Sequence, residues 1–295
     1  MRIILLFLLS TLYAINCALA DPLGKPATTE MEHATTAPEQ HDAIYVSDTL
    51  KLAPKSQHDE NKSMRYTIDA NYPQIEGENL TPGALQFNTL VNAMIKEELD
   101  RFKRYVISDM PHMKNLPDGV KHNSLNIDYD TDVIKPGNDA IVSVRLSIEG
   151  MQAGRAHPYH NNRVLNFDLV NNKSLKLSDI FKPKASYLKL VSAYTKKKLD
   201  EKLSDKWMIA DGTKPIEKNF KNWNLESDGI LFTFDEYQVA PYVDGIQEVS
   251  VPYSELKNII SPNAPIVPCI AEPKTCVVQV FVPSTEIAPT EIPEQ

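Results

Sequence analysis

Side chains that could form a binding site concentrate in FDEYQVAPYVDGIQEVSVPYSEL, which runs from Phe234 to Leu256. Its tyrosines flank a Val-Ala-Pro segment, in which the proline removes a backbone donor and fixes the chain direction. Such tyrosines either pack into a structural corner or line a groove, where aromatic rings bury area at low entropic cost. Acidic neighbours would steer a basic partner toward that groove. The candidate ligand-binding residues here are Tyr237, Tyr242, Asp235, Glu236 and Asp244.

A second candidate is the segment AHPYH, which places His157 and His160 three residues apart in a turn with a proline. Histidines at this spacing can bind zinc, but a zinc site needs further ligands. Hydrogen bonding within the turn is the expected role, and we predict no metal site. His157 joins the candidate ligand-binding residues. Only 10 glycines are present, which disfavours a glycine-rich phosphate loop, and no cofactor is expected.

The sequence contains no Gly-x-Ser-x-Gly motif, which is the pattern of a catalytic serine nucleophile. Paired carboxylates of the glycosidase type stay open, since 39 residues are Asp or Glu. Such a pair would join Glu236 to Asp168 or Asp235. We predict no catalytic residue and a protein that is not an enzyme, with a carboxylate hydrolase as the alternative.

The start of the chain has the parts of a secretory signal peptide. Arg2 precedes a short uncharged apolar run and Ala18-Leu19-Ala20, and we expect cleavage after Ala20. The run is too short to span a bilayer, which needs about 20 residues. Cys17 offers a lipoprotein alternative, which Asn16 before it disfavours. A periplasmic or secreted protein without an integral membrane segment is predicted.

Charge and cysteine content agree with export. The net charge of −8 argues against a nucleic-acid partner, which needs a basic face. Cys269 and Cys276 bracket IAEPKT, which is typical of a hairpin loop. Two cysteines in an exported protein usually pair, so we predict a structural disulfide worth about 2.5 kcal/mol. A redox pair lacks Cys-x-x-Cys spacing, and a metal site lacks a nearby histidine.

The elements that must position these side chains follow from periodicity. A helix should begin at Thr81-Pro82 and carry an apolar stripe to Val106, and a second amphipathic helix should span 185–203. Alternating apolar and β-branched residues predict strands between and after the helices. These patterns predict an α+β fold with antiparallel sheets packed against two amphipathic helices. The expected strands include 66–75, 123–134, 139–150, 163–170, 229–237 and 246–253.

Two segments resemble the RsiV-like exported domain family. Gly154–Phe181 has a Gly-x-Ala-His-Pro turn, an Asn-Phe-Asp-Leu strand and a Leu-x-Leu-Ser-Asp-Ile-Phe segment. Phe234–Leu256 has Tyr-Gln-Val-Ala-Pro-Tyr followed by a strand and Pro-Tyr-x-x-Leu. YTIDANYPQI through FNTLVNAMIKEELDRF resembles the domain that precedes the catalytic domain in PdaC-type peptidoglycan deacetylases. Together the resemblance covers Met64 to Ile260.

The resemblance implies an exported binding protein whose partner is lysozyme or cell-wall peptidoglycan. The His-x-x-x-His and Asp-Asp pairs of the deacetylase catalytic domain do not occur. The alternatives are a cell-wall-active carboxylate hydrolase and a secreted host-directed factor. The predicted divisions are a signal peptide at 1–20, a disordered leader at 21–63, a PdaC-type N-terminal subdomain at 64–153, an RsiV-like C-terminal subdomain at 154–262, and a disulfide hairpin with a Pro-rich tail at 263–295.

Overall fold

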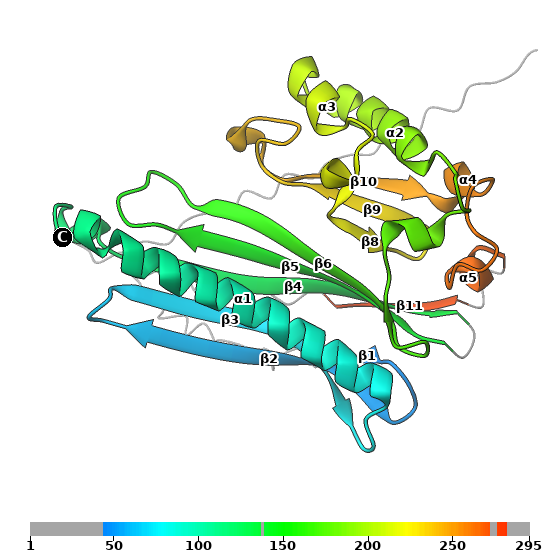
Figure 1. Ribbon diagram of the computed structural model, residues 1–295, viewed down its shortest axis with the longest axis horizontal. Helices are drawn as coiled ribbons and strands as arrows, with labels where there is room; N and C mark the ends of the chain where they lie inside the picture. The colour runs from blue at the N-terminus through cyan, green and yellow to red at the C-terminus, as the bar shows by residue number, and fades with distance from the viewer. Residues whose placement is uncertain (1–43, 137–138, 272–275, 282–295) are drawn as a thin grey trace, which may run out of the picture. The chain divides into compact units, whose positions relative to one another are not determined.

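A computed structural model describes residues 44–136, 139–271 and 276–281 (Figure 1). The expected signal peptide, the first part of the expected leader and the Pro-rich tail lie outside the described residues. No helix within the described ranges combines the length and the apolar character that crossing a membrane requires.

A large sheet holds most of the first half of the described chain. Its strand order is β1-β2-β3-β4-β5-β6-β7, and β11 pairs with β4. All neighbours are antiparallel except β3 and β4, which helix α1 connects as a crossover. The strand bounds are β1 Ile44–Tyr45, β2 Leu50–Asn61, β3 Tyr66–Gly77, β4 Asn123–Pro136, β5 Ile141–Met151, β6 Tyr159–Asp168, β7 Lys173–Ser174 and β11 Cys276–Phe281.

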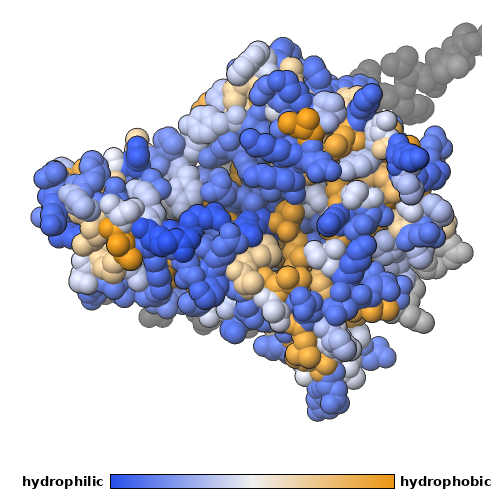
Figure 2. All heavy atoms as spheres, viewed as in Figure 1, coloured by the Kyte–Doolittle hydropathy of each residue, from blue (hydrophilic) through white to orange (hydrophobic). Residues whose placement is uncertain are grey.

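Helix α1 (Pro82–Met113) lies across the large sheet (Figure 1). It begins where the sequence predicts, because the Thr81 hydroxyl accepts a hydrogen bond from the Ala84 amide at 3.2 Å. Gly83 packs directly on the backbone of Leu169, where a Cβ would clash. Figure 2 shows hydrophobic side chains gathered near this first half of the helix, with hydrophilic ones over most of the same face.

A small antiparallel sheet carries the remaining strands. Its order is β10-β9-β8, with β8 at Trp223–Leu225, β9 at Gly229–Phe234 and β10 at Gln247–Pro252. Helix α2 (Tyr187–Lys202) packs on it through Val191 and Leu199, which are fully buried beside Phe232. Shorter helices and 3-10 turns complete the chain: η1 Asp118–Val120, η2 Leu177–Ile180, α3 Lys206–Gly212, η3 Glu217–Phe220, η4 Tyr242–Asp244, α4 Tyr253–Leu256 and α5 Val267–Ala271.

The leader predicted to extend to residue 63 is wrong for residues 44–61, which form β1 and β2. β2 pairs with β3 along its whole length. Leu50 and Leu52 at its start are buried, while Ser56 and His58 farther along are exposed and bond across to Asn71 and Asp69 of β3. The polar composition that suggested disorder therefore belongs to an exposed strand, which backbone pairing holds.

The border predicted at 153/154 falls inside the large sheet. β5 and β6 lie on opposite sides of that border yet pair from Ile141 with Asp168 to Gly150 with Tyr159. The residues expected to begin a second subdomain therefore complete the first sheet. β7 is the last strand on this path and ends at Ser174. The chain therefore passes from the large sheet toward the small one after residue 174, not at 153/154.

The predicted disulfide hairpin also has a different structure. Cys269 lies in α5 and Cys276 begins β11, and a disulfide joins them with 5.0 Å between Cα atoms. β11 pairs with β4 rather than with a strand before the loop. The disulfide thus links a helix to a strand of the large sheet. The predicted hairpin does not form, because the run VVQVF pairs with the distant strand β4.

Candidate ligand-binding surface

Two loops distant in sequence meet around Tyr242. One follows β9 and contains η4, and the other joins β5 to β6. The Tyr242 ring packs on His157, with ring centroids 4.0 Å apart, and its hydroxyl donates to the Pro158 carbonyl at 3.1 Å. The structure thus brings together two predicted candidates that lie 85 residues apart in the sequence. We call this the tyrosine–histidine surface: His157, His160, Glu236, Tyr237 and Tyr242.

His160 and Glu236 form the support of this surface. The His160 Nδ1 lies 2.8 Å from the Glu236 carboxylate, and its Nε2 lies 3.1 Å from Glu149 of β5. The Glu236 side chain is only 9% exposed. Burial, and then the charges of Glu236 and Glu149, raise the pKa of Tyr242, so its hydroxyl stays a neutral donor. Glu236 therefore positions the loop rather than facing solvent.

Tyr237 presents its ring to solvent. Its side chain is 60% exposed, and its ring centroid lies 5.9 Å from that of Tyr242. Its φ of 62° is in the left-handed region, which costs a non-glycine residue about 1 kcal/mol or more. The next residue fixes this conformation, since the Gln238 side-chain Nε2 donates to the carbonyls of Gly212 and Asn219 at 3.1 and 2.9 Å. Strain held by surrounding structure in this way is a feature of functional sites.

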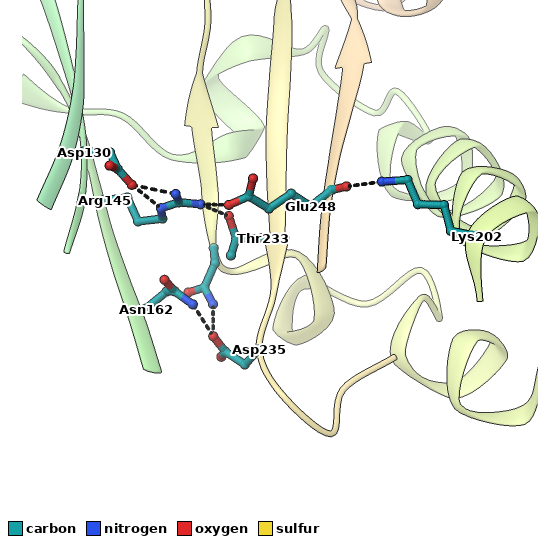
Figure 3. A network of polar contacts seen from close by, with 8 residues as sticks. Asp130, Arg145, Asn162, Lys202, Thr233, Asp235 and Glu248 are labelled. Atoms are coloured by element: carbon teal, nitrogen blue, oxygen red, sulfur yellow. Dashed lines mark hydrogen bonds and ion pairs between the residues drawn. The ribbon is translucent and has the colours of Figure 1, made fainter. Parts of the chain in front are cut away.

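The two remaining predicted acids have different surroundings. Asp235 accepts a hydrogen bond from Asn162 at 2.9 Å (Figure 3). It also accepts from Asn222 at 3.0 Å and forms an ion pair with Lys221 at 3.2 Å. These contacts join β6 to the end of β9, so Asp235 is a structural residue. Asp244 is exposed at the end of η4, where its backbone amide donates to Pro241 at 3.0 Å and its carbonyl accepts from the Gln247 side chain at 2.6 Å, while its carboxylate has no partner among the described residues. Asp244 thus leaves a free carboxylate beside the tyrosines.

Sequence reasoning missed Arg145, which connects the two sheets. Its guanidinium on β5 donates to Asp130 at 2.6 Å, to Thr233 of β9 at 3.1 Å and to Glu248 of β10 (Figure 3). The Glu248 carbonyl accepts from Lys202 of α2 at 3.4 Å. The available signal was one arginine in the apolar run IVSVRLSI, a position where burial demands partners.

The segment that contains the small sheet and the tyrosine loop matches a known family. Residues 178–254 match the family described as Protein of unknown function (DUF3298). Over 202 residues the chain is 25% identical to the Anti-sigma-V factor RsiV of Bacillus subtilis (strain 168), covering 66% of this chain and 65% of that protein. The chain contains an RsiV-like DUF3298 domain. The matched residues include both tyrosines of the tyrosine–histidine surface.

A second relative of the DUF3298 chain is the Peptidoglycan-N-acetylmuramic acid deacetylase PdaC of the same Bacillus subtilis strain. It is 29% identical over 204 residues, which are 65% of this chain and 43% of the deacetylase. The chain thus spans less than two thirds of either relative's length. The predicted resemblance is confirmed for the RsiV-like domain, whereas the PdaC-type arrangement of the N-terminal part stays a prediction.

Two crystal structures share the fold. A DUF3298 member from Bacteroides fragilis NCTC 9343 superposes with a TM-score of 0.56 at 18% identity, covering 74% of this chain and 96% of its own. A DUF3298 protein from Pseudomonas aeruginosa PAO1 gives 0.51 at 18% identity, covering 75% and 98%. At this identity the likeness concerns the fold alone, and it confirms the predicted α+β class.

Proposed function

We propose that this DUF3298 chain is an exported, non-enzymatic binding protein that recognises lysozyme or cell-wall glycan through the tyrosine–histidine surface. The observation that carries the proposal is Tyr237, an exposed ring at a strained backbone position that packed neighbours hold in place. Export, to the periplasm or outside the cell, is supported by the signal-peptide pattern of the sequence. Kinship with an anti-sigma factor favours a binding role over catalysis.

The chemistry of the surface favours a basic partner. Tyr237 and Tyr242 supply preorganised rings, which lose little entropy on binding. Asp244 adds a free carboxylate, and the whole chain has a net charge of −8. Lysozyme of the c type is basic, so both the local and the overall charge should steer it toward this surface.

A carboxylate hydrolase is disfavoured by the contacts of its three candidate acids, of which Asp235 is held by Asn162 and Asn222 at 2.9 and 3.0 Å. Glu236 is 9% exposed and bonded to His160, which leaves little room for a substrate. Asp168 accepts hydrogen bonds from the backbone and side chain of Asn171 at 2.9 and 2.8 Å, so it holds a turn. None of these three acids has the free approach that a general acid or nucleophile needs.

Titration calorimetry against c-type lysozyme tests the proposal. We expect saturable binding that weakens with salt, and at least a roughly tenfold loss for Tyr237→Ala and for Tyr242→Ala, as for central aromatic contacts. Trp207→Ala is the matched control, because Trp207 is 75% exposed but lies on α3, outside the surface. Equal binding by all variants would remove the surface from the interface.

The glycan alternative needs its own measurement. Cosedimentation with purified peptidoglycan should occur with the unaltered chain and fail with the same tyrosine variants if glycan is the ligand. Release of soluble sugar fragments, abolished by Glu236→Gln, would instead establish the hydrolase. Absence of binding to both lysozyme and peptidoglycan would refute the proposal and direct attention to host proteins.

A further inference from the structure

A small pocket of about 130 Å³ lies where the large sheet meets β8 and β9. Strands β4 and β5 contribute Asp132 and Arg145 to its wall, and Asn224 of β8 and Glu226 line the opposite side. β9 carries Leu231 in this pocket and ends at Phe234, directly before Asp235 and the tyrosine loop. Four residues of strand span roughly 13 Å, so one bound protein would cover both places.

The pocket contains a buried acceptor without a donor. The Asn166 amide donates to the Trp223 carbonyl at 2.8 Å, so its Oδ1 must be the atom that accepts the Ser143 hydroxyl proton at 2.8 Å. With that proton used, Asn224 has to face the Ser143 oxygen with its NH₂ group, at 3.0 Å. Asn224 is 6% exposed, and its Oδ1 has no hydrogen-bond partner within the described part of the chain.

Among the residues that line the pocket, one arginine faces three acids, so the negative charge is only partly balanced. Arg145 lines it, but its guanidinium is already bound to Asp130 and Glu248. The Asp132 carboxylate makes no hydrogen bond or ion pair with any residue that the structure describes, and the Glu226 carboxylate accepts from the Ser250 hydroxyl at 2.6 Å. Burial, followed by the like charge of Glu226, raises the pKa of Asp132 to about 6. Burial raises the pKa of Glu226 as well.

We propose that this pocket receives the ammonium end of a lysine side chain from a protein partner. An ammonium group has three donors and no acceptor, which complements the Asp132 and Glu226 carboxylates, and Asn224 in the same wall has a buried acceptor that lacks a donor. A metal ion fits less well, since within the described ranges no three His, Cys, Asp or Glu side chains gather closely enough to hold one. The volume is below the roughly 300 Å³ of small-molecule sites, which favours the tip of a side chain over a sugar ring.

The proposal rests on the proposed function only for the identity of the protein that supplies the lysine. The pocket itself is therefore tested first, with a small molecule that carries the same ammonium group. The probe is Nα-acetyl-lysine methylamide, titrated into the ¹⁵N-labelled chain and followed by NMR. We expect saturable shifts of the Asn224 side-chain amide and the Leu225 amide, with weak affinity of about millimolar Kd. The matched uncharged probe, acetylated at Nε, should leave these signals in place.

Variants and competing ligands make the result decisive. Asp132→Asn and Glu226→Gln should each weaken probe binding at least about tenfold, whereas Glu255→Gln, an exposed acid on α4, should not. No saturable shift of the pocket signals, equal shifts with the acetylated probe, or shifts with CaCl₂ or glucosamine but not with lysine, would overturn the proposal. Correct folding of each variant is checked from its amide spectrum.

Lysozyme binding then separates this proposal from the function proposed above. If the probe binds and lysozyme does not, the lysine pocket is supported and lysozyme is excluded as the partner. If lysozyme binds and Asp132→Asn weakens it by a similar factor, a lysine of lysozyme occupies the pocket. If lysozyme binds Asp132→Asn and Glu226→Gln as tightly as the unaltered chain, the protein-borne lysine is refuted.

Discussion

Tyr237 links local strain to recognition, and the two can be separated by substitution. Asparagine tolerates the left-handed conformation better than tyrosine does, and it lacks the ring. Tyr237→Asn should therefore leave the free energy of unfolding unchanged or raise it by up to about 1 kcal/mol, while binding to the partner is lost. Thermal unfolding and calorimetry measure both effects. A clear loss of stability would show that the ring packs in the folded protein and is no recognition element.

Asp132 should make stability depend on pH in an unusual direction for an acid. Its pKa of about 6 in the folded chain lies above the ordinary value of 3.8. The folded state thus holds the proton more tightly, so this contribution to stability is complete below pH 4 and is lost as the pH rises through about 6. Burial is the largest cause, and the neighbouring carboxylates of Glu226 and Asp130 add to it.

Asp132→Asn should consequently stabilise the chain at pH 7 to 8 by about 1–2 kcal/mol, a figure reduced for the solvent that still reaches the group. The gain should vanish at about pH 4, where both side chains are neutral. Urea unfolding at these pH values measures it. The same substitution weakens binding of the lysine probe, and a variant that gains stability while losing affinity has not simply misfolded. A destabilised variant at pH 7 would contradict the charge imbalance in the pocket.

At the scale of elements, the contact between the two sheets depends on Arg145. Its side chain is 17% exposed and reaches Asp130 in one sheet and Glu248 in the other. Arg145→Met should cost about 1–3 kcal/mol, because it removes the charged hydrogen bonds to Asp130 and Glu248, whose carboxylates water still reaches. Arg145→Lys should recover only part of this, since an ammonium cannot reproduce the guanidinium fork.

Arg104→Met is the matched control for Arg145, because Arg104 is exposed on α1 and makes no ion pair with a described residue. Denaturant unfolding gives both free energies, and equal stability of the two methionine variants would contradict a joining role. Hydrogen exchange adds a local readout. Loss of Arg145 should speed exchange in β9 and β10 more than in β3.

At the scale of the whole molecule, the DUF3298 match is not a separate folding unit. Residues 178–254 include the small sheet, but the surrounding core also contains Ile134 and Ile141 from the large sheet. Polar contacts cross the same boundary, since Asn166 of β6 bonds the backbone of Trp223 in β8. The small sheet therefore needs the large one to bury its apolar side chains.

A fragment of residues 178–254 should consequently be unfolded on its own, whereas residues 42–295 should fold. The fragment lacks β4 and β5, which cover part of its core, and also the disulfide of α5. Circular dichroism and the dispersion of amide signals compare the two. A well-dispersed spectrum of the fragment would show that this region folds independently.

The sequence by itself determined the features that depend on near neighbours in the chain. The start of α1 follows from Thr81 and Pro82, and the strands from alternation over a few residues, because capping and periodicity are local. The motifs around Tyr242 also predicted the RsiV-like domain correctly. The sequence did not predict β2, because its polar and exposed middle part lacks the alternation of a strand, which pairing with β3 nevertheless holds.

Only the tertiary structure decided which distant residues meet. His160 contacts Glu236 across 76 residues, and Arg145 contacts Glu248 across 103, separations at which no local pattern pairs them. The same holds for the pocket, where Asn224 lacks a donor only because folding commits Ser143 to Asn166. The energy of each of these contacts depends on which side chains are packed together. For these residues the packed side chains come from strands distant in the sequence, so no local pattern could predict them.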